Sequence, residues 1–178
     1  MQDGTPEDYA LLAKFEDIHI AGLPGRIILA LKQLTYSFGG YPVTRFEHSL
    51  QSATRAYSDG RNDEYIVGAL LHDVGDLLAP ATHGEMAAAI IRGYVSEEIY
   101  WIVKHHAIFQ QYHFAHLVGN NRFARDRYKG HRFFDSCAEF CALYDENCFD
   151  PSYQSLPLEF FEPLIEAIFS KTRTPSWQ

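Results

Sequence analysis

A histidine and an aspartate stand side by side, His72 and Asp73, at the end of an apolar stretch that begins at Glu64. Isoleucine, valine, alanine and leucine dominate the stretch, a pattern typical of a buried helix. Burying a carboxylate beside an imidazole costs free energy unless a counter-charge is present, and a bound cation supplies one. The pair therefore constrains the fold, because helices must surround a polar centre that can hold a cation.

Apolar residues recur at helical spacing along nearly the whole sequence. Segments 7–19 and 24–36 predict two helices, and Pro24 fits the first turn of the second. No segment has the alternating pattern of a strand, and no repeat, low-complexity tract or linker interrupts the chain. We therefore predict an all-α, single-domain helical bundle over residues 1–178. Its parts are N-terminal helices in 1–40, a metal-binding core in 41–150, and a C-terminal helix and tail in 151–178.

Capping residues delimit the helices of this core. Thr44 and Glu47 have the spacing of a capping box and begin a helix that runs to about Tyr57. Ser96 fits the N-cap of a helix that is expected to end at His106. The other expected elements are a helix after His83, a shorter helix followed by a loop in 109–130, a helix from about Arg132 to Asp145, and a helix over 157–169.

Composition excludes several classes of partner. The formal net charge is -8 with no run of lysine or arginine, which argues against nucleic acid or an anionic membrane surface. No apolar stretch is long enough to span a membrane. The 178 residues, 47% of them hydrophobic, can bury a sizeable core. We expect a protein that acts on a small molecule.

Three cysteines, an odd number, lie close together at Cys137, Cys141 and Cys148. With no signal-peptide pattern at the N-terminus, this favours a reducing cytoplasm. Cys137 and Cys141 are one helical turn apart with His131 nearby, so a small zinc site is conceivable. Buried, reduced cysteines in the core are much commoner than such zinc sites, and we predict that these three belong to the core.

Six side chains punctuate the helical pattern with imidazole nitrogen and carboxylate oxygen. They are His48, His72, Asp73, His83, His106 and Asp145. Iron, manganese and zinc all accept such ligands, so the residue types alone do not select the metal. A single histidine in a helix is usually solvated or hydrogen-bonded, but six such residues at separate helix ends and interiors are typical of a site built inside a bundle. We predict one metal centre.

The order of these residues resembles the HD-domain superfamily from residue 41 onward. The segments that carry the resemblance are FEHSLQ around His48, ALLHDVGD around His72 and Asp73, and the late Asp145. His83 in THGEMAAAI and His106 in IVKHHAI resemble the dinuclear branch of that superfamily. The resemblance implies that Asp73 bridges two metals, one held with His48, His72 and Asp145 and the other with His83 and His106. His106 has the family spacing, and His105 is the less favoured substitute.

The segments FEHSLQSA and FCALYDENCFDP resemble the oxygenases related to myo-inositol oxygenase and to the HD oxygenases that cleave carbon–phosphorus bonds. This resemblance implies a mixed-valent Fe(II)/Fe(III) pair, O2 as co-substrate and no organic cofactor. It also implies that the enzyme oxidises a carbon bearing a hydroxyl group and cleaves the adjacent bond. Asp73 and Tyr41 are the expected catalytic residues.

Asp76 is a departure from those relatives, which have a basic residue three positions after the bridging aspartate. Facing a cavity, it would favour an ammonium group; it could also cap a surface loop. The family's lid residues upstream of the first ligand are replaced by Phe38 and Tyr41, so Tyr41 either gates or coordinates, or the lid is absent. Basic residues gather at Lys104, Arg122, Arg125, Lys129 and His131, and of these Lys104 and Arg122 are the preferred contacts for a phosphonate or carboxylate.

Asp76 favours a cationic group and the basic residues favour an anionic one. A substrate with an anionic head, a hydroxylated carbon and an ammonium tail satisfies both requirements. A 1-hydroxy-2-aminoethylphosphonate or its N-methylated analogue is such a molecule. The alternative is a metal-dependent phosphohydrolase of the HD type, in which the same ligands activate water to attack a nucleotide or another phosphate ester. A non-catalytic regulatory module is a third reading, disfavoured by the intact ligand set. The sequence does not fix the oligomeric state.

Overall fold

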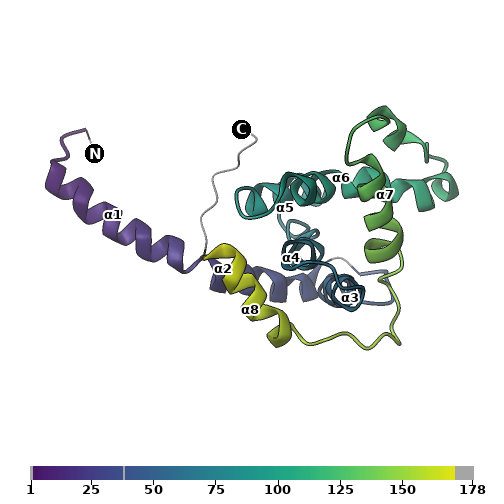
Figure 1. Ribbon diagram of the computed structural model, residues 1–178, viewed down its shortest axis with the longest axis horizontal. Helices are drawn as coiled ribbons and strands as arrows, with labels where there is room; N and C mark the ends of the chain where they lie inside the picture. The colour runs from purple at the N-terminus through teal and green to yellow at the C-terminus, as the bar shows by residue number, and fades with distance from the viewer. Residues whose placement is uncertain (1, 38, 171–178) are drawn as a thin grey trace.

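The computed structural model describes residues 2–37 and 39–170, and within these ranges it contains eight α-helices and no strand (Figure 1). The α-helices are α1 Pro6–Ala21, α2 Leu23–Gln33, α3 Arg45–Ser58, α4 Asp63–Leu71, α5 His83–Ile91, α6 Glu97–Phe114, α7 Phe134–Phe140 and α8 Leu158–Phe169. The all-α prediction is confirmed. The division into one domain stays a prediction, and the expected tail after residue 170 lies outside the described residues.

Helices α3 and α4 form the centre of the molecule. The capping box is present, since the Thr44 hydroxyl accepts from the backbone N–H of Glu47 and the Glu47 carboxylate accepts from that of Thr44. The apolar helix α4 ends at Leu71, so His72 occupies its C-cap. Burial of α4 on nearly all sides places the His-Asp pair in the interior, as the sequence predicts.

Helices α5 and α6 pack closely because a glycine lies between them. A Cβ atom added to Gly84 would lie 3.0 Å from the carbonyl oxygen of Val103 and 3.1 Å from Cε1 of His106. The prediction that the helix ends at His106 is wrong, because α6 continues to Phe114. No glycine or proline occurs between Ser96 and Gly119, so nothing in this stretch breaks the helix. Two short 3-10 helices, η2 Ala115–Val118 and η3 Ala124–Tyr128, follow.

The helix expected up to Asp145 changes its geometry on the way. Helix α7 ends at Phe140, and the chain continues as a π-helical segment, Cys141–Asp145. Such wider turns are rare and frequently occur at functional sites. The segment buries Cys141, Tyr144 and Asp145 against the core. Cys137, Cys141 and Cys148 are free and buried, which confirms them as core cysteines.

The two ends of the described chain differ in how they pack. Helix α8 buries Leu158, Phe161, Ile165 and Phe169. Helix α1 buries no residue, and Figure 1 shows it extending away from the other helices. No helix in the described part of the chain is both long and apolar enough to cross a membrane.

Candidate metal centre

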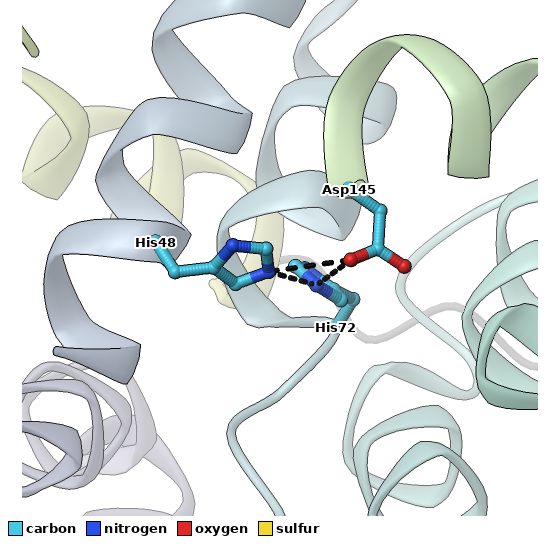
Figure 2. A group of neighbouring side chains, drawn as sticks. All are labelled: His48, His72 and Asp145. Atoms are coloured by element: carbon cyan, nitrogen blue, oxygen red, sulfur yellow. Dashed lines mark hydrogen bonds and ion pairs between the residues drawn. The ribbon is translucent and has the colours of Figure 1, made fainter. Parts of the chain in front are cut away.

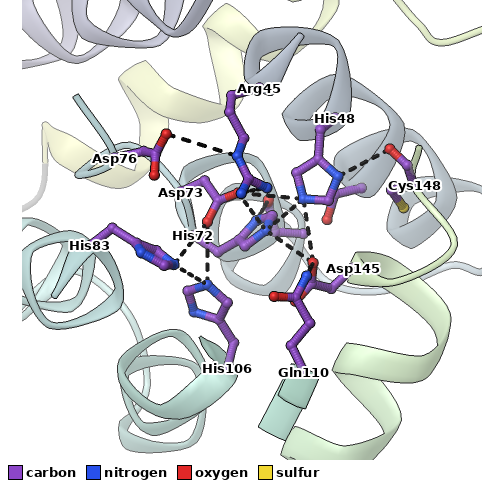
Figure 3. A network of polar contacts seen from close by, with 12 residues as sticks. Arg45, His48, His72, Asp73, Asp76, His83, His106, Gln110, Asp145 and Cys148 are labelled. Atoms are coloured by element: carbon purple, nitrogen blue, oxygen red, sulfur yellow. Dashed lines mark hydrogen bonds and ion pairs between the residues drawn. The ribbon is translucent and has the colours of Figure 1, made fainter. Parts of the chain in front are cut away.

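Six side chains from five elements converge in the interior (Figure 3). His48 comes from α3, His83 is the first residue of α5, and His106 lies in the middle of α6. His72 and Asp73 directly follow α4, and Asp145 ends the π-helical segment. Asp73 occupies the middle of the group, so that each of its two carboxylate oxygens faces a different pair of histidines.

The first half of the cluster is fully buried, and its three side chains point toward one another (Figure 2). Nε2 of His48 lies 3.0 Å from Nε2 of His72. Oδ1 of Asp145 is 3.4 Å from the first of these nitrogens and 3.8 Å from the second. Oδ2 of Asp73 lies 3.5 and 3.6 Å from the same two atoms. Two nitrogens and two oxygens thus surround one point. We call His48, His72 and Asp145 the closed half.

The second half is formed by His83 and His106, which we call the open half. Their Nε2 atoms are 3.1 Å apart, and each lies 3.3 Å from Oδ1 of Asp73. The His83 side chain is 16% exposed, whereas that of His48 is 0% exposed. His83 also lines a cavity of about 420 Å³ between α5, α6 and η3. Solvent and small molecules therefore have access to this half.

The protonation of the four imidazoles follows from their outer contacts. Each Nδ1 lies 2.7 to 3.1 Å from a backbone carbonyl oxygen. The pairs are His48 with Cys148, His72 with Ala69, His83 with Pro80, and His106 with Val103. Since a carbonyl only accepts, each Nδ1 carries the proton and each neutral ring presents an Nε2 lone pair to the centre. Lone pairs 3.0 Å apart repel one another, and a cation between them removes that repulsion. The donor set therefore fits divalent metal ions.

The carboxylates of the cluster are ionised. Burial by itself would raise the pKa of Asp73, but in the metal-free cluster His72 and His106, when protonated at Nε2, and the Arg45 guanidinium outweigh burial and hold that pKa well below its usual value. Burial opposes ionisation of Asp145 too, and hydrogen bonds from His48 and His72, when these rings are protonated at Nε2, again lower its pKa. Oδ2 of Asp145 is buried without a hydrogen-bond partner among the described residues. A buried carboxylate that lacks a partner for one of its oxygens also fits a nearby cation.

Arg45 contacts the cluster, although the sequence did not indicate it. Its guanidinium lies 3.1 Å from Oδ2 of Asp73 and 3.8 Å from Oδ2 of Asp76. It also lies over the rings of Tyr41 and Phe149, with centroids 4.8 and 5.7 Å away. Arg45 lies inside the Thr44–Glu47 capping box, directly before the segment FEHSLQ, and only this place in the first turn of α3, near His48, could have suggested it. Arg45 links the cluster to Asp76.

Two sequence-predicted residues lie beside the cluster. Asp76 is buried, pairs with Arg45 and accepts a short hydrogen bond from the Ser37 hydroxyl. A cationic substrate group would have to share Asp76 with Arg45, and its role in substrate selection stays a prediction. Tyr41 stacks on Phe149, whose ring stacks on His48 at 4.2 Å. Its role as a gate or ligand is likewise a prediction, and Phe38 lies outside the described residues.

The basic residues divide between two faces of α6. Lys104 is exposed and lines the cavity beside His83, and His105 lines it too, with its ring against Trp101. The structure thus places His106, and not His105, in the cluster. Arg122 is half-buried over the ring of Tyr112, on another side of the helix.

Gln110 and Gly75 position parts of the cluster and were also missed. The Gln110 amide donates to Oδ1 of Asp145 at 2.8 Å, and Gln110 lies one helical turn after His106. A Cβ atom on Gly75 would lie 2.6 Å from the backbone oxygen of His83, so only glycine allows α5 to begin so close to the His-Asp pair. The four-residue spacing between His106 and Gln110 could have suggested Gln110. For Gly75, the only hint in the sequence was a glycine directly before Asp76.

Comparison with known proteins agrees with this geometry. The model of the HD domain matches residues 45–135, a range that holds every cluster residue except Asp145. A curated relative from Leisingera caerulea, named [1-hydroxy-2-(trimethylamino)ethyl]phosphonate dioxygenase (glycine-betaine-forming), is 36% identical over 84 residues. The aligned part is 41% of this chain and 43% of the relative, so the chain matches less than half of that relative's length.

Proposed function

This chain belongs to the HD-domain family, and from that premise we propose that it is an O2-dependent diiron oxygenase. Its substrate is a small hydroxylated phosphonate, a 1-hydroxy-2-aminoethylphosphonate or an N-methylated analogue, and the bond cleaved is the carbon–phosphorus bond. The proposal rests on the position of the Asp73 carboxylate between two pairs of histidines. One of its oxygens faces His48 and His72, and the other faces His83 and His106. Similarity to a phosphonate dioxygenase supports the choice of reaction.

In this proposal the cluster holds two ions. His48, His72 and Asp145 with one oxygen of Asp73 hold the first, and His83 and His106 with the other oxygen hold the second. The ions are proposed to be iron in the Fe(II)/Fe(III) state, which supplies the redox chemistry with O2. The second ion has fewer protein ligands, and this supports exchangeable ligands on that side.

In the proposal, other residues of the protein orient the histidine rings and keep water away from the closed half. The carbonyl partners of the four Nδ1 atoms fix the ring orientations, as outer-shell groups do in metal sites. Phe149 covers His48 and Tyr41 covers Phe149, so this stack keeps water from the closed half. Arg45 offsets the charge of Asp73 and Asp76 on the same side. Substrate therefore approaches from the open half.

The overall reaction balances without an organic cofactor. The carbon that bears the hydroxyl becomes a carboxylate, phosphorus leaves as inorganic phosphate, and each product takes one oxygen atom from O2. The carbon and phosphorus centre together lose the four electrons that O2 accepts. Lys104 and Arg122 are the sequence-predicted contacts for the anionic head, and Asp76 and Tyr41 remain candidates for the ammonium end.

The test measures O2 consumption and phosphate release by protein loaded with iron. 1-Hydroxy-2-(trimethylamino)ethylphosphonate and its unmethylated analogue are expected to release one phosphate per O2 consumed. Analogues without the hydroxyl group are expected to be inert. Electron paramagnetic resonance of the same sample is expected to contain the signal of a coupled mixed-valent iron pair. Asp135→Ala, at an exposed position, serves as the control for a change at the cluster.

The phosphohydrolase alternative predicts a different outcome. Protein loaded with Mn(II) would hydrolyse nucleotides or simple phosphate esters, and neither O2 consumption nor a mixed-valent signal would be found with iron. That pair of results would overturn the oxygenase proposal while leaving the metal centre in place.

A further inference from the structure

The cavity beside His83 has two cationic side chains in its wall that form no ion pair with a carboxylate in the described part of the chain. They are Lys104 and Arg127, and both are exposed. Lys129, just after η3, is instead paired with Asp126 at 2.8 Å. The net charge of the whole chain is -8, so the positive charge at the cavity is a local feature. An anion that enters this cavity therefore meets two cations that no carboxylate neutralises.

Both cations have hydrogen-bond donors to offer a ligand. One N–H of Arg127 donates to the Tyr128 hydroxyl at 2.9 Å, and Cζ of Arg127 lies 4.8 Å from the centroid of that ring. This contact orients the guanidinium but uses one of its five N–H donors. Lys104 has three N–H donors and makes no hydrogen bond with the described residues. Several donors on two positive groups suit an anion with several oxygens.

The cavity lies on the opposite side of α6 from the cluster. Lys104 and Ile108 line it and are four residues apart, so they share one face of the helix. His106 is two residues from each of them, a difference of about 200° around the helix. Of the six cluster residues only His83 lines the cavity, and its Nε2 faces Asp73. An anion in the cavity is therefore a neighbour of the open half and not a ligand of its ion.

We propose that this cavity is a second ligand site, which binds a tetrahedral dianion through Lys104 and Arg127. Its volume of about 420 Å³ falls within the range of roughly 300–1,000 Å³ that is typical of small-molecule sites. Two positive charges match a phosphonate or phosphate dianion, whereas one carboxylate group would leave one of them unbalanced. The proposed function involves both anions, the first in the substrate and the second as released phosphate. No bond changes in this cavity, so the anion is bound here before or after the reaction at the ions.

Glu85 provides a test of opposite sign, because it is the acidic residue in the cavity wall. It is exposed and forms no ion pair with Lys104 or Arg127. A carboxylate near a bound dianion repels it, and the repulsion between exposed charges is modest. Glu85→Gln is therefore expected to strengthen binding of the dianion about twofold. Weaker binding in this variant would contradict an anion in the cavity.

The experiment measures the affinity of inorganic phosphate and of methylphosphonate for the metal-loaded protein by calorimetry. Lys104→Gln and Arg127→Gln are each expected to weaken binding about fivefold or more, as for loss of a charge-assisted hydrogen bond. Lys14→Gln is the control, because it removes an equal charge from α1, which extends away from the other helices (Figure 1). Its affinity should stay within about twofold of wild type. Equal losses in Lys14→Gln and Lys104→Gln would overturn the proposed site.

Two further preparations separate the cavity from the ions. Phosphate should still bind to the metal-free wild-type protein and to Asp73→Ala, because the proposed site contains no metal ion. Adding Lys104→Gln to Asp73→Ala should weaken that binding by about the same factor as in the metal-loaded protein. Phosphate binding that disappears from both metal-free preparations would place the anion at the ions and overturn the second site.

A matched pair of probes tests the charge of the ligand. The wild-type protein should prefer methylphosphonate over its singly charged monomethyl ester, because the ester balances one cation and not two. Arg127→Gln should lose most of this preference, and Arg127→Lys should restore part of it. Equal affinities of the two probes for the wild-type protein would contradict a site for a dianion.

Steady-state kinetics then identifies the source of the anion. A site that takes up substrate predicts a higher KM for the phosphonate in Arg127→Gln, whereas a site for the product predicts weaker inhibition by added phosphate. A change in neither would contradict the site. Phosphate binding that requires Lys104 and Arg127 in a protein that consumes no O2 would keep the site and reject the proposed function. Phosphonate-dependent O2 consumption without phosphate binding at the cavity would keep the function and reject the site.

Discussion

The closed and open halves of the cluster each contain two histidines, but in different surroundings. His48, His72 and Asp145 are sealed by α3, α4 and the π-helical segment, with Phe149 stacked on His48. His83 stands at the first residue of α5 beside a cavity of about 420 Å³. The comparison indicates that a pair of histidines and one oxygen of Asp73 lie in two different environments, of which the sealed one, with Asp145 added, would favour retention of an ion and the accessible one exchange of its ligands.

Asp73 joins the halves, and its removal should produce the largest effect. Asp73→Ala is expected to lose both ions, because each would lose one oxygen ligand and the shared negative charge. The loss of affinity should exceed the roughly 10–100-fold caused by removing an outer-shell partner. Metal analysis after dialysis measures it, with Asp135→Ala as the matched control. Retention of two ions by Asp73→Ala would refute the bridging assignment.

Gly75→Ala should break the open half without touching any side chain that binds metal. Its new Cβ would lie 2.6 Å from the backbone oxygen of His83 and 2.9 Å from Cβ of Met86, so the start of α5 must move. We expect about half of the bound metal to be lost, with the closed half still loaded. Gly25→Ala is the control, because nothing lies within 4 Å of the added atom. Full metal content in Gly75→Ala would mean that the open half tolerates displacement of α5.

The two halves should also differ in their contribution to folding of the metal-free protein. His48→Ala removes a fully buried ring, and the free energy of unfolding should fall by roughly 2–4 kcal/mol, as for other large buried side chains. His83→Ala removes a partly exposed ring at a helix start, and the loss should stay below about 1 kcal/mol. Urea denaturation of both variants measures the difference. Equal losses would remove the distinction between sealed and accessible halves.

The smallest effect concerns His113, beyond the cluster on α6. Burial and Arg125 lower its pKa from the ordinary value of 6.5, so the unfolded chain takes up the proton first as pH falls. Its contribution to stability is present above pH 6.5 and is lost as pH falls toward the lower pKa of the folded state. Arg125→Gln should raise the pKa of His113 in an NMR titration, and Arg127→Gln should change it less. An unshifted His113 in the wild-type protein would place it outside the field of the arginines.

Prediction from sequence succeeded where one local signal sufficed. Thr44 and Glu47 fix the start of α3 because a capping box involves only four residues. Prediction failed at His106, which was expected to end a helix because it belongs to the metal-ligand pattern. The helix continues to Phe114, and no glycine or proline follows His106 until Gly119. Arg45 could not be predicted, because its importance depends on a distance to Asp73, which is 28 positions away in the sequence.

The sequence by itself determined that the protein is helical and that it carries histidines and aspartates suited to holding a cation, since periodicity and residue chemistry are local properties. Only the tertiary structure decided which half of the centre is sealed, that Arg45 holds both Asp73 and Asp76, and that two arginines share Tyr112 without a carboxylate partner among the described residues. Those features depend on packing between segments far apart in the chain, and packing sets the distances, burial and solvent access that no local pattern encodes.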